Sequence, residues 1–270
     1  MFAAILVPLR TPQERAAYLL THFWDSLNFA DTLHSRNSIF MEQNLISYFS
    51  LFPHAQAEAR IMAVKSLMQR AEVDETAYRL LARLAEKHLY TFGSPMQNEE
   101  YFIPFLEEIV GTSLLDETEK SRFRFLLSAA LKNRPGTMAT DFTYLTPNGE
   151  LQTLYTVPAT YRLLLLFYDP DCLHCREIIT ALSTASCLQQ QIESGQLTVL
   201  AICVGEDRDL WNCSLKDLPT QWLTGFDMGC IRQEERYLLP DMPMMYLLDG
   251  EKRVVKKEVS LHQLLLKIQE

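Results

Sequence analysis

The chain of 270 residues is poor in glycine and lacks the common motifs of hydrolases. Its nine glycines do not cluster, so no segment resembles the loops that cradle phosphate groups. The six histidines do not follow the HExxH or HxxxH spacing of zinc enzymes. A Ser-His-Asp pattern is also missing. These absences argue against nucleotide hydrolysis, zinc-dependent proteolysis and serine hydrolase chemistry.

Positive charge and long apolar segments are also scarce. The formal net charge is -9 at pH 7, which argues against nucleic acid as a partner because phosphates require a basic face. The longest notable apolar run, 163–167, is far below the roughly 20 residues that span a bilayer, so no integral membrane span is expected. The N-terminus lacks a basic region and a cleavage site, which makes it a poor signal peptide. Either the protein is cytoplasmic, or its export signal was trimmed or lies upstream.

The first half of the chain has the periodicity and punctuation of helices. Thr11 is the expected N-cap, Pro12 the first helical residue and Glu14 the second half of a capping box. Further expected helices cover 42–51, 55–71, 74–90, 98–110 with an interruption at Pro104, and 116–134. The last of these stops at Pro135-Gly136. We therefore predict an all-α domain over residues 1–136.

The second half alternates between strand and helix patterns. A hairpin is expected over 141–157 with its turn at Asn148-Gly149, followed by buried strands over 161–168 and 196–204. Helices are expected over 172–192, 210–223, 231–239 and 260–270, and a second hairpin over 244–259. This order predicts an α/β domain over residues 137–270, with a mixed central sheet covered by helices on both faces.

The stretch "FYDPDCLHC", 167–175, carries the strongest chemical signal. Its two cysteines stand three residues apart where a buried strand gives way to a helix. A helix N-terminus favours a thiolate at the first position, and the spacing brings the second thiol close behind it. Cys172 is thus the expected nucleophile and Cys175 the resolving thiol. His174, between them, is expected to stabilise the thiolate. Arg176 adds positive charge in the same turn, which favours the thiolate, whereas the negative charge of Asp171 opposes it.

The second half resembles a thioredoxin-fold domain, and is most similar to TlpA/ResA-like thiol–disulfide oxidoreductases of bacterial envelopes. The likeness covers roughly 137–270 and includes the extra hairpin, "FYDPDCLHC" and "DMPMMYLLDG". It implies a cis-proline at Pro243, preceded by Met242, in a loop that binds substrate backbone near the two cysteines. We place Tyr168 with these substrate-binding residues. Asp171 stands where the family has an aromatic residue, which leaves the redox direction open.

The helical half resembles a domain of unknown function that precedes thioredoxin-like domains in Gram-negative envelope proteins. The segment "ERAAYLLTHFWDSLNFADT" carries this likeness. Together the two resemblances imply thiol–disulfide exchange with protein thiols and disulfides, in the periplasm or cell envelope, supported by a redox partner protein. They imply no cofactor and no resident metal.

Two other interpretations of the cysteine pair remain open, and a third is disfavoured. The domain could be a binding module with a vestigial dithiol. It could handle Cu(I), with Met242, Met244 and Met245 as soft ligands across from the cysteines. A peroxiredoxin would need a hydroxyl three residues ahead of Cys172, where Asp169 stands instead. Of the remaining cysteines, Cys187 and Cys203 are expected to be inert, whereas Cys213 and Cys230 could pair.

Overall fold

The chain divides into two compact units, which are described separately below. The computed structural model describes residues 9–91, 93–239, 241–257 and 259–268. One unit, the helical domain, comprises Met1–Leu131, and the other, the sheet domain, comprises Lys132–Glu270. The division lies just before the Pro135-Gly136 turn at which the sequence predicts the end of the helical half. No helix in the described ranges has the length and apolar character to cross a membrane.

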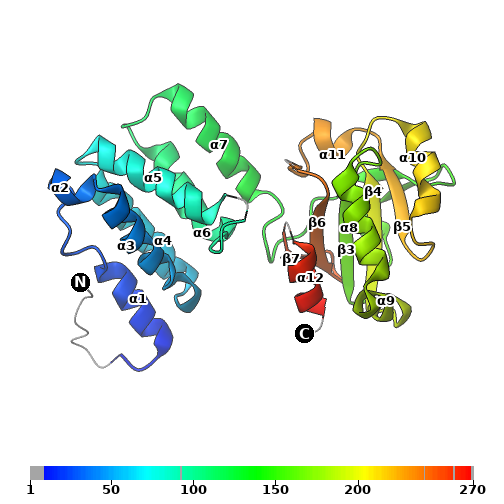
Figure 1. The fold of residues 1–270 in the computed structure, drawn as a ribbon, viewed down its shortest axis with the longest axis horizontal. Coiled ribbons are helices and arrows are strands. Elements are labelled where there is room, and N and C mark those ends of the chain that lie inside the picture. The colour runs from blue at the N-terminus through cyan, green and yellow to red at the C-terminus, as the bar shows by residue number, and fades with distance from the viewer. Residues whose placement is uncertain (1–8, 92, 240, 258, 269–270) are drawn as a thin grey trace. The chain divides into compact units, whose positions relative to one another are not determined.

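The helical domain is all α, as its periodicity predicts (Figure 1). Thr11 and Asp116 cap their helices as the sequence predicts. The Thr11 hydroxyl accepts a hydrogen bond from the Glu14 N–H in a complete capping box, and the Asp116 carboxylate accepts one from the Glu119 N–H at 2.8 Å. Two short elements, α2 and η1, were not predicted. The elements are α1 (Pro12–His22), α2 (Thr32–Ser35), α3 (Ser38–Phe49), η1 (Phe52–His54), α4 (Ala57–Ala71), α5 (Glu75–Leu89), α6 (Glu99–Gly111) and α7 (Glu117–Leu131).

Helix α6 continues through Pro104, contrary to the predicted interruption. A proline inside a helix removes one hydrogen bond and costs about 3 kcal/mol. Pro104 is itself buried, and so are the four residues around it: Phe102, Ile103, Phe105 and Leu106. Burial of each large apolar side chain contributes about 1.5–3 kcal/mol, so packing outweighs the lost bond.

Aromatic side chains hold the core of the helical domain together. The ring of Phe49 lies 5.4 Å from that of Phe52 and 5.8 Å from that of Phe105, both edge to face. All three rings are buried, and they join α3, η1 and α6. Each edge-to-face pair contributes about 0.5–1.5 kcal/mol of stability beyond that from burying the rings. The rings thereby fix the adjacent elements α3 and η1 to α6, which is about 50 residues further along the chain.

The sheet domain contains a seven-stranded mixed sheet in the order β2-β1-β5-β4-β3-β6-β7. Figure 1 labels its strands β3 to β7. Strand β3 pairs in parallel with β4, which pairs in parallel with β5, while β6 runs antiparallel to β3. The mixed sheet with helices agrees with the predicted fold class. Its elements are β1 (Thr143–Leu145), β2 (Leu151–Thr153), η2 (Leu154–Thr156), β3 (Arg162–Tyr168), α8 (Leu173–Thr184), α9 (Ser186–Glu193), β4 (Leu197–Cys203), α10 (Arg208–Ser214), η3 (Leu215–Asp217), β5 (Leu223–Asp227), α11 (Cys230–Gln233), β6 (Met244–Asp249), β7 (Val254–Lys256) and α12 (Leu261–Ile268).

Two cores lie on opposite faces of this sheet. Alternate residues of β3 belong to different clusters. Leu164, Leu166 and Tyr168 belong to the first cluster, and Leu163, Leu165 and Phe167 belong to the second. The first cluster also contains buried residues of α8, α9, α10 and α12. The second contains residues of β1, η2 and α11. Burial on both faces explains why β3 is apolar throughout.

The sequence predicts neither strand β5 nor the break between α8 and α9. Gly225 lowers the strand propensity of "LTGFD", but a Cβ there would overlap the ring of Tyr144 on β1, so the paired strands require the glycine. The predicted helix 172–192 breaks at Ala185, whose backbone is extended. There the side chain of Gln189 donates to the carbonyl of Ser183 and replaces a helical hydrogen bond.

Candidate functional site

A tight loop joins β3 to α8 and sets the position of the first cysteine. The Cys172 N–H donates to the Asp169 carbonyl at 3.1 Å, and the Asp171 N–H donates to the Asp169 carboxylate at 3.0 Å. Asp169 therefore organises the loop through both its backbone and its side chain. Sequence reasoning missed this role, although a carboxylate directly after a central strand and beside the motif was a usable signal.

Cys172 is the N-cap of α8, as the sequence predicts. Its Sγ atom accepts a hydrogen bond from the Cys175 N–H at 3.2 Å and is half-buried. A backbone N–H bonds an anionic acceptor more strongly than a neutral one, so this arrangement suits a thiolate. The loop thus presents a partly accessible sulfur at the start of a helix.

Cys175 lies one turn further on and is fully buried. Burial, together with the neighbouring Cys172 sulfur, raises the pKa of the Cys175 thiol to about 12. Cys175 therefore remains protonated at neutral pH. The two sulfurs differ in accessibility in the sense that the sequence predicts for a nucleophile and a resolving thiol.

The predicted proline loop lies against the first cysteine. The Met242-Pro243 peptide bond is cis, and the Met242 carbonyl oxygen is 3.7 Å from the Cys172 Sγ atom. The two segments meet because β6, which begins at Met244, pairs antiparallel with β3. Residues 70 positions apart in sequence thereby form one surface.

His174 points away from the buried part of the site. Its side chain is 64% exposed, and its Nδ1 atom lies 3.4 Å from the carboxylate of Glu177, one helical turn further on. A positive charge on this ring would be shared with Glu177 and screened by water. The imidazole is thus a weaker candidate for stabilising the thiolate than the sequence suggests.

Tyr168 cannot contact substrate, contrary to the prediction. It is only 1% exposed, and its pKa is raised by burial. As the last residue of a central strand, it directs its ring into the core that also contains Trp211 of α10. The apolar run of β3 does not indicate which face of the sheet Tyr168 occupies.

The arrangement of methionines weakens the Cu(I) interpretation. Met245 belongs to the core cluster that contains Cys175, but Met244 lies in the cluster on the opposite face. Alternation along a strand separates the two side chains, so the predicted trio cannot converge on the cysteines. Within the described ranges, no group of three or more His, Cys, Asp or Glu residues is arranged to hold a metal ion.

The four remaining cysteines do not form a second pair. All six cysteines are free thiols, so the possible Cys213–Cys230 disulfide is not formed. Cys203 is fully buried in β4, and burial raises the pKa of its thiol to about 11. Cys230 Sγ lies 3.4 Å from the carbonyl oxygen of Thr143.

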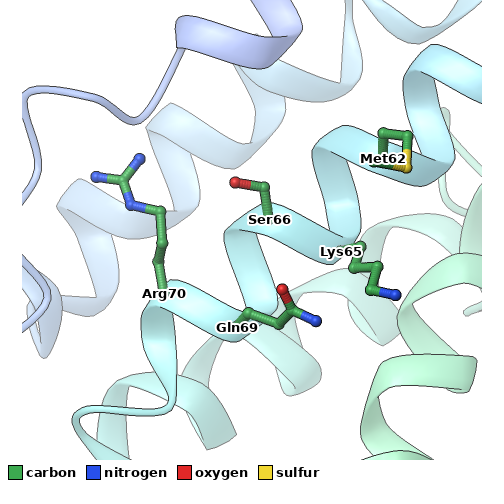
Figure 2. Close-up of a pocket in the computed structure, with 5 residues that line it drawn as sticks. All are labelled: Met62, Lys65, Ser66, Gln69 and Arg70. Carbon is green, nitrogen blue, oxygen red and sulfur yellow. The ribbon is translucent and has the colours of Figure 1, made fainter.

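The helical domain has a shallow hollow of about 310 Å³ on the surface of α4 (Figure 2). All five lining residues come from this one helix: Met62, Lys65, Ser66, Gln69 and Arg70. The guanidinium of Arg70 is engaged, because it donates to the carbonyls of Trp24 and Leu27 at 2.9 and 3.0 Å. Neither a thiol nor a carboxylate lines the hollow, so the dithiol remains the better candidate site.

Comparison with known proteins agrees with this architecture. A thioredoxin-like protein from Bacteroides caccae is 34% identical, with a TM-score of 0.87 over 100% of this chain and 97% of that one. The chain belongs to this thioredoxin-like family. Its helical part matches the family model described as a domain of unknown function (DUF5106) over residues 2–133, as the sequence resemblance implied.

Other solved structures match one part of this thioredoxin-like protein. The C-terminal domain of an uncharacterized protein from Bacteroides fragilis is 34% identical, with a TM-score of 0.50 over 51% of this chain and 99% of that one. The thioredoxin domain of a thiol-disulfide oxidoreductase from Bacteroides vulgatus is 19% identical, with a TM-score of 0.45 over 50% of this chain and 96% of that one. No curated protein matches the sequence.

Proposed function

We propose that the protein exchanges thiols and disulfides with protein substrates through Cys172 and Cys175. The observation that carries this proposal is the pairing of a half-buried sulfur at a helix start with a buried thiol one turn behind it. The Met242 carbonyl beside Cys172 supports it, because that loop offers backbone groups next to the reacting sulfur. The hairpin β1–β2 ahead of β3 favours the TlpA/ResA-like group in particular.

The reaction proceeds in two displacement steps. The Cys172 thiolate attacks a substrate disulfide, forming a mixed disulfide and releasing one substrate sulfur, which takes up a proton. Cys175 then loses its proton and attacks the Cys172 sulfur, which releases the second substrate thiol. The substrate disulfide gains two electrons and the Cys172–Cys175 pair loses two. Run in reverse, the same steps oxidise a substrate dithiol.

The remaining residues of the site have supporting roles in this proposal. Met242 and Pro243 would hold an extended substrate through its backbone, and His174 would modulate the first step through its charge. A redox partner protein would restore the dithiol or the disulfide after each turnover. The exchange requires no cofactor. We place it in the periplasm or cell envelope, as the sequence resemblance to envelope proteins implies.

Single-sulfur variants test the assignment. With Cys175→Ser, we expect a stable mixed disulfide with a peptide disulfide, seen as added mass that dithiothreitol removes. With Cys172→Ser, exchange should fall by at least about 10³-fold, because a hydroxyl cannot replace the thiolate nucleophile. Cys213→Ser, which alters an exposed thiol of α10, should behave like the unmodified protein. Exchange that survives in Cys172→Ser would refute the site and favour the binding-module interpretation.

The reduction potential decides the direction of exchange. Equilibration with glutathione buffers should give one two-electron transition for the Cys172–Cys175 pair. A value near that of thioredoxin, about -270 mV, indicates a reductase, and one near about -120 mV indicates a disulfide donor. Failure to form the disulfide in any buffer would overturn the redox proposal.

A further inference from the structure

The edge of the sheet that carries the dithiol also carries a concentration of carboxylates. Because β3, β4 and β5 are parallel and β6 opposes them, the segments 169–172, 204–207, 228–229 and 241–243 all lie at this edge. Two contacts show that these segments lie close together. Cys172 Sγ contacts the Met242 carbonyl, and the Asp169 carboxylate lies beside Gly205. These segments contain five acidic residues and neither lysine nor arginine: Asp169, Asp171, Glu206, Asp207 and Asp241. The ends of β1, β2 and β7 at the same edge add Asp141 and Lys257, and the connection from α11 to β6 adds Glu234, Glu235 and Arg236, so an excess of carboxylates remains.

The opposite edge of the same sheet lacks this imbalance. Its connecting segments are 146–150, 157–161, 194–196, 218–222 and 250–253. They contain two acidic and two basic residues, which cancel: Glu150, Glu251, Lys252 and Arg253. The acidic character is therefore a property of the dithiol edge and does not simply reflect the negative charge of the whole chain.

Three of the carboxylates at the dithiol edge are available to a partner. Asp171, Glu206 and Asp241 are exposed, and within the described ranges none of them forms an ion pair. The first follows β3, the second follows β4 and the third precedes β6, so they approach Cys172 from three segments. Two apolar side chains accompany the first cysteine. Leu173, adjacent to Cys172, is 65% exposed, and Met242 is half-buried beside the sulfur.

From this arrangement we infer that the site selects extended polypeptides with an apolar residue beside the reacting cysteine and lysine or arginine on its flanks. The inference rests on the proposed exchange function and adds its substrate class. The apolar residue would cover Leu173 and Met242, and the basic residues would meet Asp171, Glu206 and Asp241. Charge complementarity of this kind increases the rate of encounter about tenfold or more at low ionic strength.

Two matched peptide disulfides test the inference on the full-length reduced protein. Both carry leucine next to the cysteine, and they differ only in having two flanking lysines or two flanking glutamates. A neutral disulfide, 4,4′-dithiodipyridine, reports exchange without charge recognition. We expect the second-order rate constant of the single-turnover exchange to be about tenfold higher for the lysine peptide than for the glutamate peptide in 20 mM salt. The ratio should fall toward one in 0.5 M salt, where screening acts within a few ångströms.

Variants locate the effect on the surface. The triple variant Asp171→Asn, Glu206→Gln, Asp241→Asn should reduce the peptide ratio to within about twofold while retaining reaction with the neutral disulfide. The control variant Glu150→Gln, Glu193→Gln, Glu251→Gln removes three exposed acids near the opposite edge and should keep the ratio. Normalising both peptides to the neutral disulfide cancels any change in the reactivity of Cys172 itself.

Each outcome bears on one of the two proposals. Equal rates for both peptides, with normal reaction of the neutral disulfide, overturn the substrate class and leave the exchange function standing. The substrate class is also overturned if the control variant loses the preference for the lysine peptide while the variant of Asp171, Glu206 and Asp241 retains it. If the neutral disulfide does not react, the exchange function fails and the substrate class fails with it. Should the triple variant not fold, the peptide ratio and its salt dependence in the unmodified protein decide the question.

Discussion

The two domains use their polar side chains differently. In the helical domain, charged groups mostly pair with one another or cap helices: Arg36 binds Asp74, and Arg79 binds Glu75 and Glu119. At the dithiol edge of the sheet domain, exposed carboxylates stand without ion pairs within the described ranges. All six cysteines also lie in the sheet domain. The comparison indicates that the helical domain uses charge to stabilise its fold, whereas the sheet domain keeps charge and thiols available for a partner.

The largest expected effect tests whether the two domains depend on one another. Phe105→Ala removes a buried ring that contacts Phe49, and we expect a loss of about 3–5 kcal/mol in the unfolding free energy of the helical domain. Reaction with a neutral disulfide should persist, because the core of the sheet domain is separate. Tryptophan fluorescence during urea denaturation reports Trp24 of the helical domain together with Trp211 and Trp222 of the sheet domain, and disulfide reactivity reports the sheet domain alone. The two signals together separate the two quantities.

Phe125→Ala is the matched control for this variant. Phe125 lies on α7 and is 50% exposed, so its removal should change stability by less than about 0.5 kcal/mol. Simultaneous loss of exchange and of helical structure in Phe105→Ala would show that the domains fold as one unit, contrary to the comparison.

A smaller effect concerns pH and belongs to the sheet domain alone. Burial raises the pKa of the Cys203 thiol to about 11, whereas an unfolded cysteine ionises near 8.5. Between these values the folded chain holds a proton that the unfolded chain has released, so stability falls as pH rises. One such thiol contributes about 1.4 kcal/mol per pH unit. Cys203→Ala should therefore flatten the decline in unfolding free energy between pH 9 and 11.

Val199→Ala provides the comparison for Cys203→Ala. It shortens another buried side chain of the same strand and should lower stability by a constant amount without changing the pH slope. An unchanged slope in Cys203→Ala would mean that the buried thiol does not titrate as proposed. Measurement of the urea midpoint at several pH values distinguishes the two results.

The smallest expected effect concerns a structural arginine of the helical domain. Arg70→Ala removes the donor of the hydrogen bonds to the carbonyls of Trp24 and Leu27. We expect it to lower the free energy of unfolding by about 1 kcal/mol. Arg83→Ala, at an exposed position of α5, should be nearly neutral. Thermal unfolding of both variants would measure the difference. Equal stability of the two would contradict the view that charge in this domain serves the fold.

Much of this architecture could be predicted because its signals are local. The capping box at Thr11 and Glu14, the Asn148-Gly149 turn and the apolar run of β3 depend on neighbouring residues, and the structure confirms each of them. The position of Cys172 at a helix start is equally local. Strand β5 could not be predicted in this way, because Gly225 weakens the local strand pattern while the ring of Tyr144, its neighbour in space, requires the glycine.

The sequence by itself determined where the capped helices and the first hairpin turn lie, and which two thiols stand one turn apart, since hydrogen bonds within a few residues fix both. Only the tertiary structure decided that Tyr168 is buried and that Met244 and Met245 face opposite sides of the sheet. It also gathered the carboxylates of separate loops at one edge. These features depend on the pairing of strands distant in sequence, which no local pattern encodes.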